Sequence, residues 1–324
     1  MKALLSLFPV YLLLVISGCS GASNPTIKLG HALDTSHPVH KSMVYMSELV
    51  EQRSNGELKI EIYPSQQLGT ERELVELLQI GSVGITKVAS TTLENFAPSY
   101  QVFGIPFIFR DDEHRFNVLE GAIGQQVLED GEDYWFRGLC YYDAGSRSFY
   151  TKEKPVMTPD DLDGLKIRVM ESRSAMEMVS TLGGSPTPLA WGELYTALQQ
   201  GVVDGAENNA PSFYLSRHYE VSKYYTINQH TAVPDVLIIS THIWNSLSEE
   251  HKQILQQAAL ESAEYQKTLW AEASAEALAA VKEAGVEVIY PDKTPFQEKV
   301  APIYQKYEND PVIGDLMKQI LELE

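Results

Sequence analysis

A strand-and-helix pattern occurs twice in this chain, and this repeat restricts the possible folds more than any other feature of the sequence. In both copies a glycine suits the position that follows a helix, and a strand is predicted to begin two residues later. We therefore predict two similar α/β lobes that face each other; chance likeness between two generic strand–helix units is the alternative. The shared residues lie 120 positions apart: Glu73, Leu74, Leu78, Gln79, Gly81 and Val83 in the first copy, and Glu193, Leu194, Leu198, Gln199, Gly201 and Val203 in the second.

The segments around the first copy alternate in the same way. Such alternation is typical of α/β domains, in which ligands bind beyond the carboxyl ends of the strands. The segments after Val83 and Val203 are therefore expected to border one shared cleft. The tripeptide Leu165-Lys166-Ile167 also matches Leu58-Lys59-Ile60. Strands are predicted over 26–32, 58–62 and 83–88, and helices over 39–53 and 71–80.

Residues 248–284 predict an unusually long helix. The segment contains neither Gly nor Pro, is rich in Ala, Glu, Gln, Leu and Lys, and is followed by Gly285. Ser246 and Glu249 have the spacing of a capping box at its start. At ~1.5 Å per residue, one continuous helix would extend roughly 55 Å, the length of two small domains. A broken pair of helices is the alternative.

The N-terminus predicts export. Residues 1–18 read as a signal peptide: Lys2 precedes an apolar run that is shorter than the ~20 residues a membrane-spanning helix needs. Ile16-Ser17-Gly18-Cys19 resembles a bacterial lipobox, so Cys19 is expected to become a lipidated N-terminus, with plain cleavage near Ala22 as the alternative. Residues 19–25 suit a flexible tether. Cys140 then has no partner for a disulfide and is expected in the core.

Charge and motifs narrow the class of function. The chain has 44 acidic and 25 basic residues and a net charge of −19, whereas nucleic-acid binding needs clustered Lys and Arg. The sequence has no phosphate-binding glycine loop, no zinc-spaced Cys/His cluster and no Gly-x-Ser-x-Gly motif. We therefore expect no nucleic-acid partner, no cofactor and no metal. The same absences disfavour an enzyme without excluding one.

A few polar residues in the second half suit a small acidic ligand. Arg168 lies in a predicted strand between Ile and Val, and its planar guanidinium fits a carboxylate in a two-pronged clamp. A surface ion pair at a sheet edge is the alternative. Arg147 precedes another extended segment, and Asn208 follows the second strand, where its amide can both donate and accept. Trp191 offers a stacking face for a ring, unless it belongs to the core.

Several motifs together resemble the DctP-type solute-binding proteins of TRAP transporters, over essentially the whole mature chain. The resemblance implies a two-lobed, periplasmic-binding-protein-like α/β fold with a ligand cleft between the lobes and a long helix spanning both. Lobe I would comprise 26–144 and about 232–260; lobe II, with the rest of the helix and the C-terminal segment, would comprise 145–231 and about 261–324. The motifs are the lipobox and segments 58–60, 63–69, 164–169, 184–188 and 203–208.

The resemblance also implies a function and a site. It implies an exported, periplasmic protein that binds an organic acid without catalysis and passes it to membrane permease subunits; a sensor kinase in place of the permease is the alternative. Arg168 matches the family's carboxylate clamp. The other positions carried over from the family are Arg147, Trp191, Asn208, Glu71, Ser90, Asp235 and His37.

Details of the second half resemble one subgroup in particular. Trp191-Gly192-Glu193 replaces the Phe-Ser-Glu of sialic-acid binders, and segments 204–211, 216–221 and 229–231 resemble proteins that bind hexuronates such as glucuronate and galacturonate. We therefore expect a hexuronate ligand. The alternatives are another organic acid, such as a C4-dicarboxylate or an aldonate, and an exported sugar-acid enzyme that uses Glu71 or His37 as a base.

Overall fold

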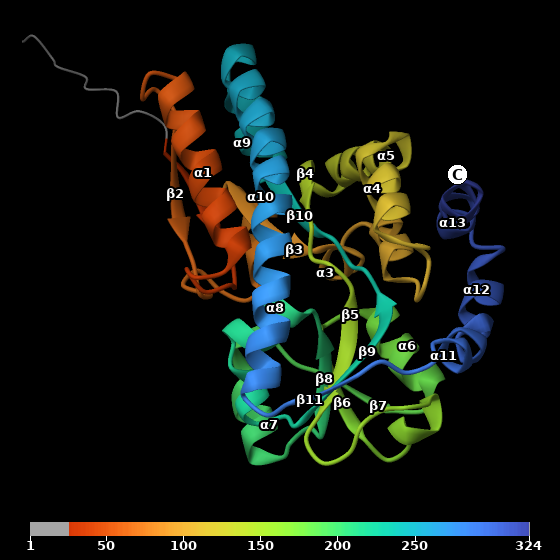
Figure 1. The fold of residues 1–324 in the computed structure, drawn as a ribbon. Helices are drawn as coiled ribbons and strands as arrows, with labels where there is room; N and C mark the ends of the chain where they lie inside the picture. Colours follow the sequence, from red (N-terminus) through yellow and green to blue (C-terminus); the bar gives the residue numbers. More distant parts are fainter. Residues whose placement is uncertain (1–25, 324) are drawn as a thin grey trace, which may run out of the picture.

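The computed structural model describes residues 26–323, which form two lobes with one mixed β-sheet each (Figure 1). The elements around the first sheet are β1 (Thr26–Gly30), α1 (Pro38–Arg53), β2 (Lys59–Tyr63), α2 (Glu71–Gln79), β3 (Ile85–Ala89), α3 (Ser90–Leu93), η1 (Pro98–Gly104), α4 (Asp112–Glu120), α5 (Ala122–Asp130), η2 (Gly131–Tyr134), β4 (Phe136–Tyr142), β10 (Asp235–Ser240) and α9 (Thr241–Ser246).

The elements around the second sheet are β5 (Arg147–Thr151), η3 (Pro159–Leu162), β6 (Lys166–Val169), α6 (Arg173–Leu182), β7 (Ser185–Pro188), η4 (Trp191–Glu193), α7 (Leu194–Gln200), β8 (Gly205–Asn208), α8 (Ala210–Leu215), η5 (His218–Glu220), β9 (Tyr224–Thr231) and β11 (Glu287–Ile289). The long helix α10 (Glu249–Glu283) and the C-terminal helices α11 (Thr294–Lys299), α12 (Ala301–Tyr307) and α13 (Ile313–Glu322) complete the described chain.

The two sheets have the same strand arrangement. The first runs β2-β1-β3-β10-β4, and the second runs β7-β6-β8-β5-β9-β11. In each, the first three strands are parallel and the next two pairings are antiparallel, and in the second sheet the sixth strand, β11, pairs in parallel with β9. Strand β8 is therefore the counterpart of β3, and β6 of β1. The fold class predicted from the sequence, a two-lobed α/β protein, is confirmed.

The repeat is confirmed at the helix ends. Gly81 and Gly201 have φ angles of 75° and 73°, and the residue after each donates its N–H to a carbonyl five positions earlier, at 2.9 Å in both lobes. Strands β3 and β8 then begin at equivalent positions, Ile85 and Gly205, which are two residues later than predicted from the sequence. The matching Leu-Lys-Ile tripeptides, in contrast, do not mark equivalent strands, because β6 takes the sheet position of β1 and not that of β2.

Besides helix α10, the chain passes between the lobes along two adjacent paths. One path joins β4 to β5, and the other joins β9 to β10, so that β10 lies between β3 and β4 in the first sheet. The paths are held in register by two strand pairs, Tyr142 with Asp235 and Arg147 with Thr231. This crossing places the ends of β5 and β10 next to the space between the lobes.

Helix α10 is continuous over 35 residues, which excludes the broken pair (Figure 1). It packs against α1 and β4 of the first lobe and against α8 of the second. Near its middle, buried Gln266 accepts from the backbone N–H of Asp143 at 2.8 Å and donates to the Asp143 carbonyl at 2.7 Å. The helix is thereby tied to the path from β4 to β5.

The C-terminal helices also contact both lobes. Helices α11 and α12 pack against α6, whereas α13 packs against η1 and α5. The residue boundaries of the lobes stay a prediction. Cys140 is a buried free thiol on β4, as expected. The predicted signal peptide and tether, Cys19 included, lie outside the described residues, and within 26–323 none of the helices combines the length and apolar character needed to cross a bilayer.

Candidate ligand-binding site

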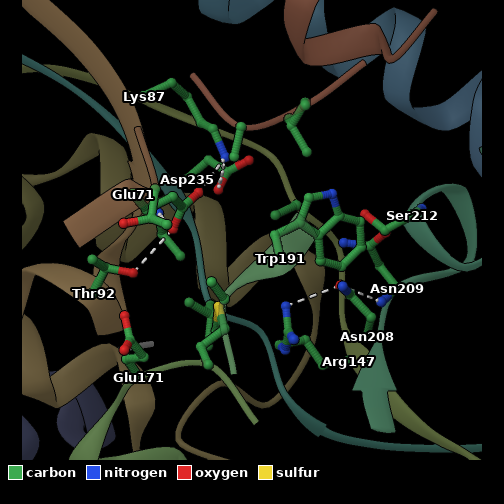
Figure 2. Close-up of a pocket in the computed structure, with 18 of the residues that line it drawn as sticks. Glu71, Lys87, Thr92, Arg147, Glu171, Trp191, Asn208, Asn209, Ser212 and Asp235 are labelled. Atoms are coloured by element: carbon green, nitrogen blue, oxygen red, sulfur yellow. Dashed lines mark hydrogen bonds and ion pairs between the residues drawn. The ribbon is translucent and has the colours of Figure 1, made fainter. Parts of the chain in front are cut away.

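A cavity lies where the carboxyl ends of β3, β6 and β8 meet (Figure 2). Its empty volume is about 780 Å³, counting the part that is open to solvent. Both lobes contribute to its lining, as the repeat predicts. Seven of the eight predicted ligand-binding residues line it: His37, Glu71, Arg147, Arg168, Trp191, Asn208 and Asp235.

Ser90 is the predicted residue that does not line this cavity. It is the first residue of α3 and is fully buried, and its backbone N–H donates to the Pro234 carbonyl at 2.9 Å. Its hydroxyl has no hydrogen-bond partner within residues 26–323. The backbone of Ser90 thus links the end of β3 to the residue before β10.

Arg168 is a buried cation without an acidic partner. It is 2% exposed on β6, which excludes the surface ion pair considered from the sequence. Its Nε and Nη2 donate to the Leu189 carbonyl at 3.0 and 2.7 Å, while Nη1 has no hydrogen-bond partner in the described chain. The guanidinium lies 5.8 Å from the centre of the Trp191 ring. Burial lowers the pKa of Arg168. An anionic ligand would reduce this penalty and gain a strong, charge-assisted hydrogen bond from the free Nη1.

Arg147, in contrast, is already paired. Its Nε and Nη2 donate to the carboxylate of buried Glu207, and Nη1 donates to Asn208 Oδ1 at 2.9 Å. Burial alone would raise the pKa of Glu207, but the Arg147 charge lowers it to about 2. Asn208 Oδ1 also accepts from the Asn209 backbone, which leaves the Asn208 amide N–H groups as donors for a ligand (Figure 2).

Lys87 was not predicted from the sequence as a site residue. It is the central residue of the cavity wall that the first lobe forms, opposite Arg147 and Arg168 of the second lobe. It is 2% exposed on β3, and its Nζ contacts Glu71 Oε1 at 3.1 Å and Asp235 Oδ1 at 3.0 Å. Burial lowers the pKa of Lys87, but the charges of Asp235 and Glu71 outweigh burial and raise it. The other Glu71 oxygen accepts from the Thr92 hydroxyl at 3.0 Å and from the Ala89 backbone at 3.3 Å.

His37 presents a neutral donor. It caps the N-terminus of α1, where its Nδ1 accepts from the Val39 backbone at 3.3 Å, and its Nε2 has no partner within residues 26–323. Burial, followed by the nearby Lys87 charge, lowers the pKa of His37 to about 3. Its ring centre lies 5.9 Å from that of Trp270, another lining residue that the sequence did not single out.

The arrangement suits an acidic ligand that also carries hydroxyl groups. The donors available to it are Arg168 Nη1, His37 Nε2 and the Asn208 amide, and the acceptors are the carboxylates beside Lys87. Trp191 and Trp270 add ring faces. Within residues 26–323, no cluster of three or more His, Cys, Asp or Glu side chains has the geometry to hold a metal ion.

Comparison with known proteins identifies the family. Residues 29–310 match the family described as bacterial extracellular solute-binding protein, family 7, or DctP. A TRAP periplasmic solute-binding protein from Roseobacter denitrificans, solved with β-D-glucuronate, is 36% identical with a TM-score of 0.90, over 93% of this chain and 100% of that one. One from Bradyrhizobium sp. BTAi1, solved with D-galacturonate, is 37% identical with a TM-score of 0.90, over 92% and 100%.

A third structure has a different ligand. The TRAP periplasmic solute-binding protein from Polaromonas sp. JS666, solved with D-erythronate, is 32% identical with a TM-score of 0.89, over 92% of this chain and 99% of that one. The family match and these likenesses over nearly the full length confirm the resemblance seen in the sequence. The chain belongs to the DctP family of bacterial extracellular solute-binding proteins.

Proposed function

We propose that this protein is the extracytoplasmic binding subunit of a TRAP transporter and that its ligand is a hexuronate, D-glucuronate or D-galacturonate. The observation that carries the proposal is the buried Arg168 guanidinium, which has a free N–H and no acidic partner in the described chain. Burying an unpaired cation is costly, so a ligand carboxylate is the natural partner for Arg168. The hexuronates bound by the Roseobacter and Bradyrhizobium proteins support this assignment.

The remainder of a hexuronate is a ring with several hydroxyl groups, and the other lining residues suit it. Asp235 and Glu71 supply carboxylate oxygens that accept from hydroxyls, and Asn208 and His37 supply donors. Trp191 supplies a ring face beside Arg168. In this proposal closure of the lobes buries the ligand and shifts the population toward the closed form, which the membrane permease recognises.

The same residues support binding without catalysis. A lyase acting on a uronate would need a base, and both candidates are poor ones. Both Glu71 oxygens accept hydrogen bonds from Lys87, Thr92 and Ala89, and the pKa of His37 is lowered to about 3 by burial and by Lys87. The sequence of the N-terminus supports periplasmic location through a lipid anchor at Cys19.

A ligand screen tests the proposal. Thermal unfolding is measured with D-glucuronate, D-galacturonate, D-erythronate and succinate, and a ligand at ~100 times its Kd should add roughly 2.7 kcal/mol of stability. We expect the two hexuronates to raise the midpoint most and to be recovered intact after incubation. Stabilisation by succinate or erythronate alone would contradict the hexuronate assignment, and a converted uronate would contradict binding without catalysis.

A further inference from the structure

We propose that Lys87 is a positioning residue that decides which acids the cavity accepts. It holds Asp235 and Glu71 as anionic acceptors, so that the first-lobe wall takes up hydroxyl groups and rejects a second carboxylate. Figure 2 shows Lys87, Glu71 and Asp235 together on one side of the cavity, with Arg147 and Asn208 on the other. The inference rests on the proposed function and narrows its ligand class to monocarboxylates with a hydroxylated tail.

The charges on the two walls are of opposite sign. On the second-lobe wall Glu207 neutralises Arg147, and Arg168 remains as an unpaired positive charge. On the first-lobe wall one lysine faces two carboxylates, which leaves an excess of one negative charge. The other charged lining residues, Arg72 and Glu171, are exposed to solvent. A ligand with a carboxylate at one end and hydroxyls at the other matches this polarity, whereas a dicarboxylate places like charges together.

The hydrogen bonds identify the open acceptor. Glu71 Oε2 accepts from two donors, and Lys87 occupies one oxygen of Glu71 and one of Asp235. Asp235 Oδ2, in contrast, has no hydrogen-bond partner among the described residues. The strand pairs of Asp235 with Ala89 and Tyr142 fix its backbone from both sides. A ligand hydroxyl is therefore expected to donate to Asp235 Oδ2.

Lys87 favours the ionised form of this acceptor. Burial raises the pKa of Asp235, and the Lys87 charge offsets part of that rise. The other charged groups that act on Asp235 are Glu71 and Arg147. The Lys87 charge also acts on two histidines: His31 and His37 have pKa values lowered to about 2 and about 3, mainly by burial, so they stay neutral above pH 5. Without Lys87, two carboxylates would share one wall with no cation between them, and their mutual repulsion would raise the pKa of one of them.

The experiment measures the affinities for D-glucuronate and D-glucarate, which has the same six carbons and a carboxylate at each end. Calorimetric titrations from pH 5.5 to 8 compare the wild type with Lys87→Met and Asp235→Asn. Lys59→Met is the matched control, because Lys59 is an exposed lysine in a surface ion pair with Glu51. The wild type and the control should prefer glucuronate by on the order of tenfold or more, at every pH.

The variants should change this preference in different ways. Asp235→Asn should weaken glucuronate binding on the order of tenfold, because an anionic acceptor is lost. It should also reduce the preference for glucuronate over glucarate, because the first-lobe wall loses its excess negative charge. Lys87→Met should increase the preference for glucuronate over glucarate at pH 8, where Glu71 and Asp235 are both ionised. The preference should decrease as the pH falls to 5.5, because one of these carboxylates becomes protonated. A purely structural role for Lys87 would lower affinity without making the preference depend on pH.

The outcomes separate this inference from the proposed function. A pH-independent preference in Lys87→Met, or an unchanged preference in Asp235→Asn, would overturn the role of Lys87 while leaving hexuronate binding intact. If Lys87→Met does not fold, Asp235→Asn decides. If the wild type binds D-erythronate and no hexuronate, the proposed function fails, and the same variants decide the inference with D-erythronate against meso-tartrate.

Discussion

Two buried arginines border the same cavity, but only Arg168 has a guanidinium N–H left for a ligand without an acid beside it. Arg168→Lys replaces a planar fork with a point charge, so the two-pronged contact with a carboxylate is lost. We expect hexuronate affinity to fall on the order of tenfold to a hundredfold, as for the loss of a charged hydrogen bond. Calorimetric titration measures the change. Exposed Arg173→Lys is the control, and equal affinities in the two variants would place the clamp elsewhere.

Neutral His37 makes the stability of the empty protein depend on pH. The pKa of His37 is lowered from 6.5 to about 3 by burial and by Lys87, so the unfolded chain binds a proton that the folded chain does not. The free energy of unfolding should therefore fall as the pH drops below 6.5. At pH 5 this single group accounts for about 2 kcal/mol.

His37→Asn tests this dependence while retaining a residue that can cap α1. Between pH 7 and pH 5 the variant should lose about 2 kcal/mol less stability than the wild type in urea unfolding. The exposed His242→Asn variant serves as control and should follow the wild-type curve. Parallel curves for wild type and His37→Asn would show that the folded protein takes up the proton at His37.

The sequence predicted some site residues and missed others for a physical reason. Arg168 was predictable because an arginine between Ile and Val in a strand is unusual unless it has a partner. Lys87 also lies inside a strand, Ile85–Ala89, but was not singled out. Its burial depends on Glu71 and Asp235, which are 16 and 148 positions away. Which distant carboxylates surround a lysine is set by tertiary packing and not by local pattern.

At the scale of elements, the helix ends at Gly81 and Gly201 give a paired prediction. Both glycines have φ near 75°, where an alanine is strained by about 1–2 kcal/mol. An added Cβ would come no closer than 3.6 Å to His242 at Gly81, or to Lys152 at Gly201, so crowding adds little. Gly81→Ala and Gly201→Ala should each lower the free energy of unfolding by this amount. Urea unfolding measures both variants, and a lower free energy of unfolding in only one of them would contradict the equivalence of the two helix ends.

Elements defined by local pattern were predictable, and their partners were not. The absence of Gly and Pro predicted α10, and the structure has it over Glu249–Glu283. The predicted helix before Gly201 begins instead as a short 3-10 turn, η4, and becomes α-helical at Leu194. No local pattern showed that β10 inserts between β3 and β4, because Asp235 at the start of β10 lies 148 positions after Lys87 of β3.

At the scale of the whole molecule, net charge and ligand charge are separate matters. The chain carries −19 overall, yet the proposed ligand is an anion. Net charge governs solubility and long-range encounter, whereas the cavity responds to its own few residues. The acidity of the surface therefore predicts only a modest penalty on the association rate, reduced by salt.

The position of β10 predicts that the first lobe does not fold by itself. A fragment of residues 26–144 contains β1 to β4 but lacks the strand that joins β3 to β4, and it also lacks α10, which covers α1. We expect this fragment to show no cooperative unfolding transition by circular dichroism, while the full chain shows one. A sigmoidal transition in the fragment, comparable in midpoint with that of the full chain, would contradict this.

The same inserted strand sets the order of assembly. During synthesis the first 230 residues emerge without the segment Asp235–Ser240 that completes the first sheet, so the first lobe stays incompletely folded until a segment in the last third of the chain has been made. Neither lobe can then complete its sheet alone. The chain enters β10 of the first sheet from the second lobe, and it enters β11 of the second sheet from the first lobe through α10. A destabilising substitution in either lobe is therefore expected to unfold both lobes together and not one lobe alone.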